Sequence, residues 1–386
     1  MNTSQLNCLF GLLALFPLFL MGQTKPKTSL KWQLGSGAGY EYNVYNAGSN
    51  QFFLIGEDSI VGIQSGFFQR LQLNTIGKIS QKQSTIGFKF RTKYDYFPSL
   101  TEANLFRPEV SVFYQYKLKK FHSLFWEGNY VLNRTNNLED ATSVINTTNA
   151  YRKTWMEMGY KFRPIRFNTS KITLSLQDKA YAEQETGQLR YASKRIDFQT
   201  KQRFKRKGKS PKYLILDASL EQRNYENILF FDSEEEEEEF EEEFEERIWR
   251  YYAGKISYEK EVTDRLELGV GLSYLERTDV LAERLGYQQP SIFTQLSYED
   301  DKWTLSMKLQ YDYRQYTNLK ARSDQEEKLL HQYLRASLRA NYHIADQWEW
   351  QTSLQVRQRW RNYSEGATRF LPYTNVVLSS GLRFSF

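Results

Sequence analysis

The stretch that decides the fold is Tyr373–Phe386, with the sequence YTNVVLSSGLRFSF. One set of alternate positions is mostly apolar and comprises Val376, Leu378, Ser380, Leu382, Phe384 and Phe386. The other set is mostly polar or small and comprises Asn375, Val377, Ser379, Gly381, Arg383 and Ser385. Successive side chains of a β-strand point to opposite faces. The stretch therefore predicts a strand with one apolar face, one polar face and an aromatic end.

The same period of two recurs along the chain, for example in Val110–Lys119, Arg265–Tyr274 and Lys302–Arg314. It predicts about sixteen strands, with fourteen to eighteen left open: 29–46, 60–75, 81–96, 105–119, 121–136, 148–163, 167–180, 189–206, 211–229, 245–261, 264–280, 289–299, 301–318, 328–344, 346–363 and 373–386. Each is long enough to cross a bilayer at a tilt, for which about 9–11 residues suffice.

The predicted connections alternate between short and long. The short ones are Lys119–Lys120, Arg163–Arg166, Thr263–Asp264, Asp300–Asp301 and Ala345–Asp346. The long ones cover 47–59, 137–147, 230–244, 281–288, 319–327 and 364–372. Transmembrane barrels of bacteria have short periplasmic turns and longer extracellular loops. The alternation thus predicts a barrel whose first connection lies outside the cell.

Composition fits a barrel better than a soluble β-protein. Aromatic residues make up 16% of the 386 residues, yet the mean hydropathy is −0.66. Many aromatics in a hydrophilic chain are typical of an aromatic girdle around a wet lumen. A soluble propeller or sandwich is the alternative, but soluble strands are shorter, about 5–6 residues. No repeat of propeller length is visible.

The first residues read as a targeting segment. Leu9–Met21 is apolar, too short to span a membrane as a helix, and followed by polar residues. We expect a signal peptide over residues 1–22 and a single barrel domain over 23–386. The one cysteine, Cys8, precedes most of the apolar stretch, so a mature chain without thiols is expected, as suits an oxidising compartment.

These features together resemble a bacterial outer-membrane β-barrel of porin-like size. The resemblance implies an all-β, antiparallel, transmembrane up-and-down barrel in the outer membrane of a Gram-negative-type bacterium, with both termini in the periplasm. It implies contact with outer-membrane lipids and no cofactor. It also implies insertion by a barrel-assembly machinery that reads the last strand, through Leu382, Phe384 and Phe386. The oligomeric state is left open.

Aromatic residues gather where girdles belong. Trp303, Trp348 and Trp350 follow short turns, while Tyr94, Tyr251, Tyr252, Tyr311 and Tyr313 lie near the other ends of their strands. Aromatic side chains favour the membrane–water interface, so interfacial anchoring is expected. Only a few aromatics are expected to face inward, where a sugar could stack on them: Phe113, Phe125 and Trp155.

Basic residues crowd the expected lumen face. One cluster comprises Arg314, Arg335, Arg339, Arg357, Arg359 and Arg361, and a ladder on an earlier strand comprises Lys89, Arg91 and Lys93. A net positive lumen concentrates anions. Alternatively, these charges pair with carboxylates on neighbouring strands and stiffen the wall. The two interpretations stay open because the register is unknown. The net charge of +6 does not predict a nucleic-acid partner for a secreted barrel.

The acidic run within residues 232–246 is expected to be a surface loop. Its like charges repel, which favours an extended, solvated segment. A divalent-cation site at Glu234, Glu238 and Glu242 is the alternative, although Glu-only runs lack the spacing of a built calcium loop.

Catalytic signals are poor. The three histidines are His122, His331 and His343. Only His331, which lies near Asp324 and Glu326, is a candidate for a catalytic pair with a carboxylate. No enzyme is expected. The leading hypothesis is a passive channel for small, preferentially anionic solutes. The alternative is a non-conducting surface or assembly barrel whose extracellular loops bind a partner or divalent cations.

Overall fold

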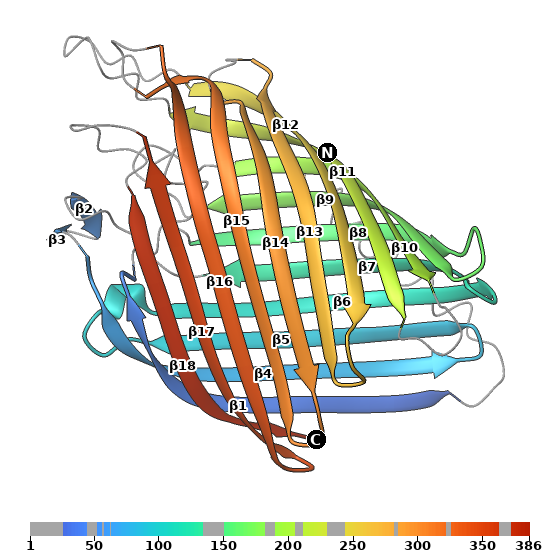
Figure 1. Ribbon diagram of the computed structural model, residues 1–386. Helices are drawn as coiled ribbons and strands as arrows, with labels where there is room; N and C mark the ends of the chain where they lie inside the picture. Colours follow the sequence, from blue (N-terminus) through green and yellow to red (C-terminus); the bar gives the residue numbers. More distant parts are fainter. Residues whose placement is uncertain are drawn as a thin grey trace.

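Sixteen antiparallel strands form one closed barrel in the part of the chain that the structure describes (Figure 1). The computed structural model describes residues 26–44, 52–55, 58–61, 63–133, 150–181, 190–204, 211–229, 244–281, 285–321, 326–362 and 372–386. The barrel strands are β1 (Lys27–Tyr42), β4 (Gly66–Gln81), β5 (Ser84–Tyr96), β6 (Leu105–Lys119), β7 (His122–Asn133), β8 (Tyr151–Phe162), β9 (Asn168–Tyr181), β10 (Arg190–Phe204), β11 (Lys212–Leu229), β12 (Phe244–Glu261), β13 (Leu266–Asp279), β14 (Tyr287–Glu299), β15 (Trp303–Lys320), β16 (Lys328–Ala345), β17 (Trp348–Arg361) and β18 (Tyr373–Ser385). The predicted all-β barrel of sixteen strands is confirmed. The expected signal peptide, including Cys8, lies outside the described residues.

Each barrel strand pairs with the next barrel strand along the chain, from β4 to β18, and β1 pairs with both β4 and β18. Tyr373–Ser385 is therefore the closing strand: Gly381 lies opposite Gly37, and Val377 lies opposite Glu41. Lipid offers no hydrogen bonds, so an open sheet edge is not tolerated in hydrocarbon. Closure between β1 and β18 removes the last two edges.

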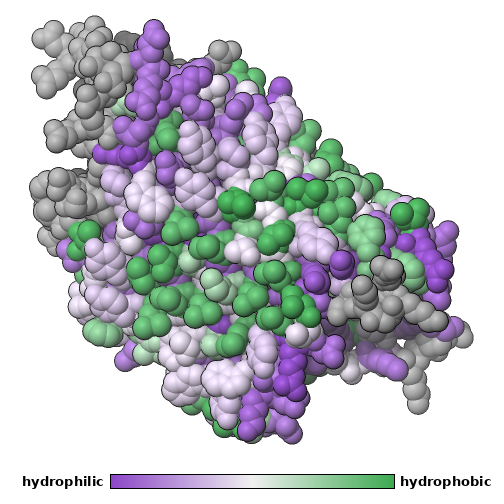
Figure 2. All heavy atoms as spheres, viewed as in Figure 1, coloured by the Kyte–Doolittle hydropathy of each residue, from purple (hydrophilic) through white to green (hydrophobic). Residues whose placement is uncertain are grey.

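The outer face is an apolar belt. Large apolar side chains at alternate positions are strongly exposed, for example Phe67 at 72%, Ile292 at 57% and Leu272 at 56%. Figure 2 shows a band of hydrophobic side chains across the face formed by β13 to β18, with hydrophilic residues gathered above and below. A closed barrel with a continuous apolar outer belt is the outer-membrane type of transmembrane protein. Among the described residues, no helix is long and apolar enough to cross a membrane.

The two ends of the barrel differ. At the end that we call the short-turn end, the strands are joined by connections as brief as 82–83, 120–121 and 346–347. The opposite, long-connection end carries 43–65, 97–104, 134–150 and 230–243 among others. The predicted alternation of short and long connections is confirmed. Which end faces the periplasm remains an expectation from that alternation.

The second predicted strand was wrong in position. Residues 60–75 were expected to form it, but the barrel strand β4 covers Gly66–Gln81 and turns at Lys82. Lys82 adopts a positive φ of 38°, which non-glycine residues rarely do. The turn KQ contains none of the usual turn residues Gly, Asn, Asp or Pro, so nothing in the sequence marks it. Phe121 and Phe167 also have positive φ in short turns, at 69° and 62°.

Two other boundaries differ from expectation. Residues Phe52–Ile55 and Asp58–Val61 form a separate two-stranded hairpin, β2–β3, within the first long connection. The strand β12 begins at Phe244, which pairs with Leu229 of β11. The last residues assigned to the acidic loop, 244–246, therefore belong to the wall. The rest of that loop, with Glu234, Glu238 and Glu242, lies outside the described residues.

Glycines opposite phenylalanines let aromatic rings lie flat against the inner wall. Gly271 pairs directly with Phe293, and a Cβ there would lie 2.3 Å from the ring and 2.6 Å from the Ile256 carbonyl oxygen. Gly87 with Phe113 and Gly159 with Phe125 repeat this arrangement. Such cross-strand cover of a strand glycine by an aromatic ring is a known stabilising device.

The closing strand is anchored by aromatic packing at the short-turn end. Phe386 stacks on Trp32 of β1, with ring centroids 4.2 Å apart, and Phe384 lies 4.7 Å from the ring of Trp348. The Trp32 and Phe386 backbones also exchange hydrogen bonds in both directions. Of the residues implied in recognition by the assembly machinery, Phe386 thus also fastens β18 to β1, and Phe384 packs against β17. The recognition itself stays a prediction.

We expect Gly271→Ala to lower the free energy of unfolding by about 1–3 kcal/mol, because the new methyl meets both a ring and a backbone carbonyl. Gly35→Ala is the matched control, since a Cβ there makes only ordinary contacts from 3.6 Å outward on the same lumen face. Its effect should stay within about 0.5 kcal/mol. Denaturant titration of the refolded barrel, followed by heat-modifiable gel migration, measures both. Equal losses in the two variants would contradict the role given to the Gly271–Phe293 pair.

Candidate functional site

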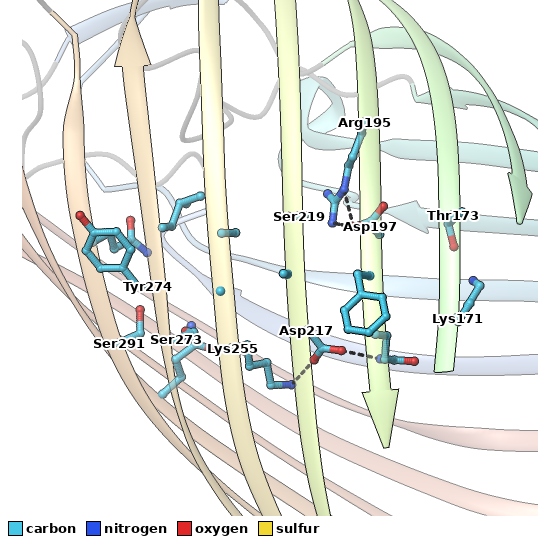
Figure 3. A pocket seen from close by; sticks show the side chains of 18 of the residues that line it. Lys171, Thr173, Arg195, Asp197, Asp217, Ser219, Lys255, Ser273, Tyr274 and Ser291 are labelled. Carbon is cyan, nitrogen blue, oxygen red and sulfur yellow. Dashed lines mark hydrogen bonds and ion pairs between the residues drawn. The ribbon is translucent and has the colours of Figure 1, made fainter. Parts of the chain in front are cut away.

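The lumen face is polar and charged, and part of it is hollowed. A cavity of about 570 Å³ is lined by residues of strands from β8 to β16. Figure 3 shows Lys171, Arg195, Asp197, Asp217 and Lys255 as labelled side chains around it. Cations and carboxylates alternate there: Arg195 Nη2 lies 2.6 Å from Asp197 Oδ1, and Lys255 Nζ lies 3.9 Å from Asp217 Oδ2. This wall of the lumen is therefore charged but locally balanced.

Each residue of the basic ladder on β5 is paired with a carboxylate. Lys89 Nζ lies 2.7 Å from Glu127 Oε1 of β7. Arg91 lies 3.7 Å from Glu109 of β6, and Lys93 lies 2.6 Å from Asp95 on its own strand. For this ladder, the geometry favours the interpretation that charges pair and stiffen the wall. Its side chains contribute little net field to the lumen.

The other wall differs. Strands β15 to β17 carry seven inward basic residues, Lys308, Arg314, Arg335, Arg339, Arg357, Arg359 and Arg361, but only two inward acids, Asp312 and Glu349. Glu349 forms an ion pair with Arg383 of β18. Asp312 is fully buried and lies 3.5 Å from Arg335. Positive charge is thus concentrated on this side.

Within this wall, Arg335, Arg339 and Arg357 form what we call the arginine face. Arg335 pairs directly with Arg357 on the neighbouring strand, and Arg339 follows four residues along β16. Like charges directly opposite one another destabilise a sheet. Arg339 and Arg357 are exposed and make no hydrogen bond or ion pair with any residue that the structure describes. The charge of Arg357 acts electrostatically on Glu41 of β1, but the two residues form no ion pair.

The remaining members of the predicted cluster are used differently. Arg314 donates from Nε to Gln289 Oε1 at 2.8 Å and lies 4.4 Å from the centroid of the Tyr287 ring. Arg359 is buried over Tyr373, at 4.7 Å. Arg361 lies opposite His331 at the long-connection end. The predicted cluster therefore divides into the arginine face and three residues nearer the rim, of which Arg359 is buried.

Arg314 and Arg359 belong to a feature that the sequence did not predict. Near the long-connection end, inward aromatic rings and inward cations alternate from β8 to β18. We call this the aromatic–cation ring and define it by Tyr151, Tyr181, Tyr191, Tyr225, Trp249, Tyr251, Tyr287, Tyr316, Tyr333 and Tyr373 with Lys179, Arg223, Arg277, Arg314 and Arg359. Most of these rings are less than a tenth exposed. Cation–π contacts gain strength when they are shielded from water.

Arg277 is the central contact of this ring. Its guanidinium lies 4.2 Å from the Trp249 ring and 4.4 Å from the Tyr287 ring. It also donates from Nε to the Leu285 carbonyl at 2.8 Å. The Leu285 backbone N–H donates in turn to Asp279, which is itself ion-paired with buried Arg247. These bonds tie residue 285, in the connection between β13 and β14, to the inner wall.

Two aromatic assignments from sequence need correction. Tyr251 was expected in the lipid-facing girdle, but it is 9% exposed and packs within the ring. Its neighbour Tyr252 is exposed on the outer face, and strand alternation forbids both from facing lipid. The three expected sugar platforms are each covered by a lysine: Lys89 over Phe113, Lys171 over Phe125 and Lys153 over Trp155, at 5.1, 4.4 and 5.0 Å. They are not free stacking surfaces.

The histidines form no catalytic arrangement within the described ranges. His331 is completely buried and contacts the Tyr333 hydroxyl at 3.2 Å. Asp324, its expected companion, lies outside the described residues. His122 and His343 lie beside short turns, as expected, and contact Tyr160 and Thr304. No group of three or more His, Cys, Asp or Glu residues that could hold a metal occurs in the described part of the chain.

No protein-family model matches the chain, and no curated protein matches it. Among solved structures, an anion-selective porin from Comamonas acidovorans aligns with 11% identity and a TM-score of 0.42, over 94% of this chain and 100% of the porin. A bacterial polysaccharide outer membrane secretin aligns with 7% identity and a TM-score of 0.45, over 92% and 98%. OmpT, an outer membrane protein of Vibrio cholerae, aligns with 10% identity and a TM-score of 0.42, over 95% and 99%. Likeness at this level carries no argument about solute or activity.

We expect Arg277→Met to lower the free energy of unfolding by about 2–4 kcal/mol, because it removes two ring contacts and leaves the buried Leu285 carbonyl without its donor. Arg357→Met removes the same chemistry from a position without such contacts and should change stability by less than about 0.5 kcal/mol. Denaturant titration in the same detergent compares the two. Equal destabilisation would show that the ring contributes nothing beyond an ordinary inward arginine.

Proposed function

We propose that this barrel is a passive channel for small solutes with a preference for anions. The observation that carries the proposal is the arginine face, where Arg335 and Arg357 lie directly opposite each other and Arg339 and Arg357 lack partners among the described residues. Two like charges held together are relieved by a counter-ion. Clefts lined by one sign of charge raise the local concentration of the opposite ion. An anion passing along β16 and β17 supplies that counter-ion.

The distribution of charge across the lumen supports the same proposal. The ladder of β5 and the cavity wall of β9 to β12 hold their cations in ion pairs, so their fields largely cancel. The cations of the aromatic–cation ring contact aromatic faces rather than the lumen. In the arginine face, Arg339 and Arg357 carry positive charge without an ion pair to any described residue, and so add to the positive potential of the lumen. In the orientation expected for an outer-membrane barrel, the short-turn end of the channel lies in the periplasm.

Single-channel recording in a planar bilayer tests the proposal. We expect open steps and, under a salt gradient, a reversal potential that reports a permeability ratio favouring chloride over potassium. The preference should weaken between 0.1 and 1 M salt, because the screening length falls from about 10 Å to about 3 Å. Silence at all voltages would overturn the channel and would favour the alternative of a non-conducting surface barrel, for which the packed aromatic–cation ring is the supporting observation.

The double variant Arg335→Gln with Arg357→Gln should move the permeability ratio toward unity while leaving the barrel folded. The control variant is Lys212→Gln with Lys260→Gln, which also removes two cations. Lys212 and Lys260 lie opposite each other on the outer faces of β11 and β12, both exposed. Their loss should leave the ratio unchanged. An unchanged ratio in the arginine variant, or the same shift in both variants, would contradict the role of the arginine face.

A further inference from the structure

A groove on the outer face of β8 to β12 has no part in the proposed channel. It has a volume of about 690 Å³ and lies on strands drawn in green to yellow in Figure 1. Its floor is apolar, and its rim carries two cations, Lys194 and Arg250, beside the apolar Met156 and Leu176. We propose that this groove binds one anionic membrane lipid whose headgroup carries phosphate, in the leaflet at the long-connection end.

The floor is a row of residues that pair in register across five strands. Met158 lies opposite Leu174, Leu174 opposite Ile196, Ile196 opposite Leu220, and Leu220 opposite Tyr252. All five line the groove, and all are exposed on the outer face. Such a row offers an acyl chain a continuous apolar surface.

The rim is the next outward-facing row, two residues along each strand. There Lys194 of β10 pairs with Gln222 of β11, which pairs with Arg250 of β12. Two residues along a strand correspond to about 7 Å. The cations therefore lie one row closer to the long-connection end than the apolar floor, as the headgroup of a lipid lies beyond its chains.

The chemistry of the rim selects an anion. Lys194 is exposed and has no hydrogen bond or ion pair with any residue that the structure describes. Arg250 donates from Nε to Gln222 Oε1 at 3.3 Å, which leaves its other donors available. The nearest outward carboxylates have partners of their own: Asp178 pairs with Arg190, and Glu276 accepts the Tyr274 hydroxyl at 3.1 Å.

The height of the rim fits a headgroup. Lysine or arginine on the lipid face costs about 2–4 kcal/mol at the bilayer midplane and close to nothing at the interface. Tyr252, in the adjoining row, is the kind of residue that marks the interface. The two cations thus lie at the level of lipid phosphates. Their strands are two spacings, about 10 Å, apart, so both side chains can approach one headgroup with Gln222 between them.

The test uses the full-length purified barrel, with native mass spectrometry of lipids retained from mixed micelles that contain phosphatidylglycerol and phosphatidylcholine. We expect one retained phosphatidylglycerol, preferred over phosphatidylcholine. Lys194→Gln with Arg250→Gln should reduce the preference by about fivefold for each cation removed. Lys212→Gln with Lys260→Gln, which removes a cation pair from the outer face at the short-turn end, should leave it unchanged.

A second variant tests the floor independently. Ile196→Trp fills the groove with an aromatic side chain that is tolerated on a lipid-facing surface, and it should abolish retention of the lipid although both cations remain. The swap Lys194→Arg with Arg250→Lys keeps the charges and should retain the preference. The proposal is overturned if both double Gln variants lose phosphatidylglycerol equally, or if neither Lys194→Gln with Arg250→Gln nor Ile196→Trp changes retention. Channel recordings do not enter these outcomes, so failure here is distinct from failure of the proposed channel.

Discussion

The structure depends on one constraint: inside a bilayer, every backbone donor and acceptor must find a partner within the protein. A sheet satisfies this only when its first and last strands pair, and here β1 and β18 do so over ten consecutive residue pairs. Gly37 and Gly381 lie opposite each other in that seam, and a Cβ on either would lie within 2.4 Å of a backbone oxygen. The seam is therefore packed as closely as backbones allow. The aromatic contacts of Phe384 and Phe386 fasten its end.

Closure gives the barrel wall one face toward lipid and one toward the lumen, and the two faces require different side chains. Within the apolar belt, outward side chains need only be apolar, so their order there is free. Inward side chains share a narrow polar space in which each charge meets the others. The chain meets that demand in three ways: ion pairs on β5 to β12, cation–π contacts near the long-connection end, and an unbalanced arginine face on β16 and β17. Under the proposed function, the third is where an anionic solute would be attracted.

How much of this was predictable depends on which physical rule each feature obeys. Alternation with a period of two is local, so the sixteen strands and the inward position of Arg335, Arg339 and Arg357 follow from the sequence. Register is not local. It decides that Lys89 reaches Glu127 while Arg335 faces Arg357, and no pattern along the chain contains that information. The turn at Lys82 was missed for a different reason, because a positive φ there is imposed by closure of the β4–β5 hairpin rather than by a turn-forming residue.

The aromatic–cation ring was missed because tyrosine has two roles in a barrel. At an interface it anchors the wall in the membrane, and beside a shielded guanidinium it neutralises charge without a carboxylate. The face of the strand on which a tyrosine lies decides between the two roles, as the neighbours Tyr251 and Tyr252 demonstrate. In the aromatic–cation ring, Arg277 and Arg314 lie against aromatic faces, while Arg223 also pairs with Glu221. Under the proposed function, the selectivity of an anion path would be set deeper in the lumen, at the arginine face.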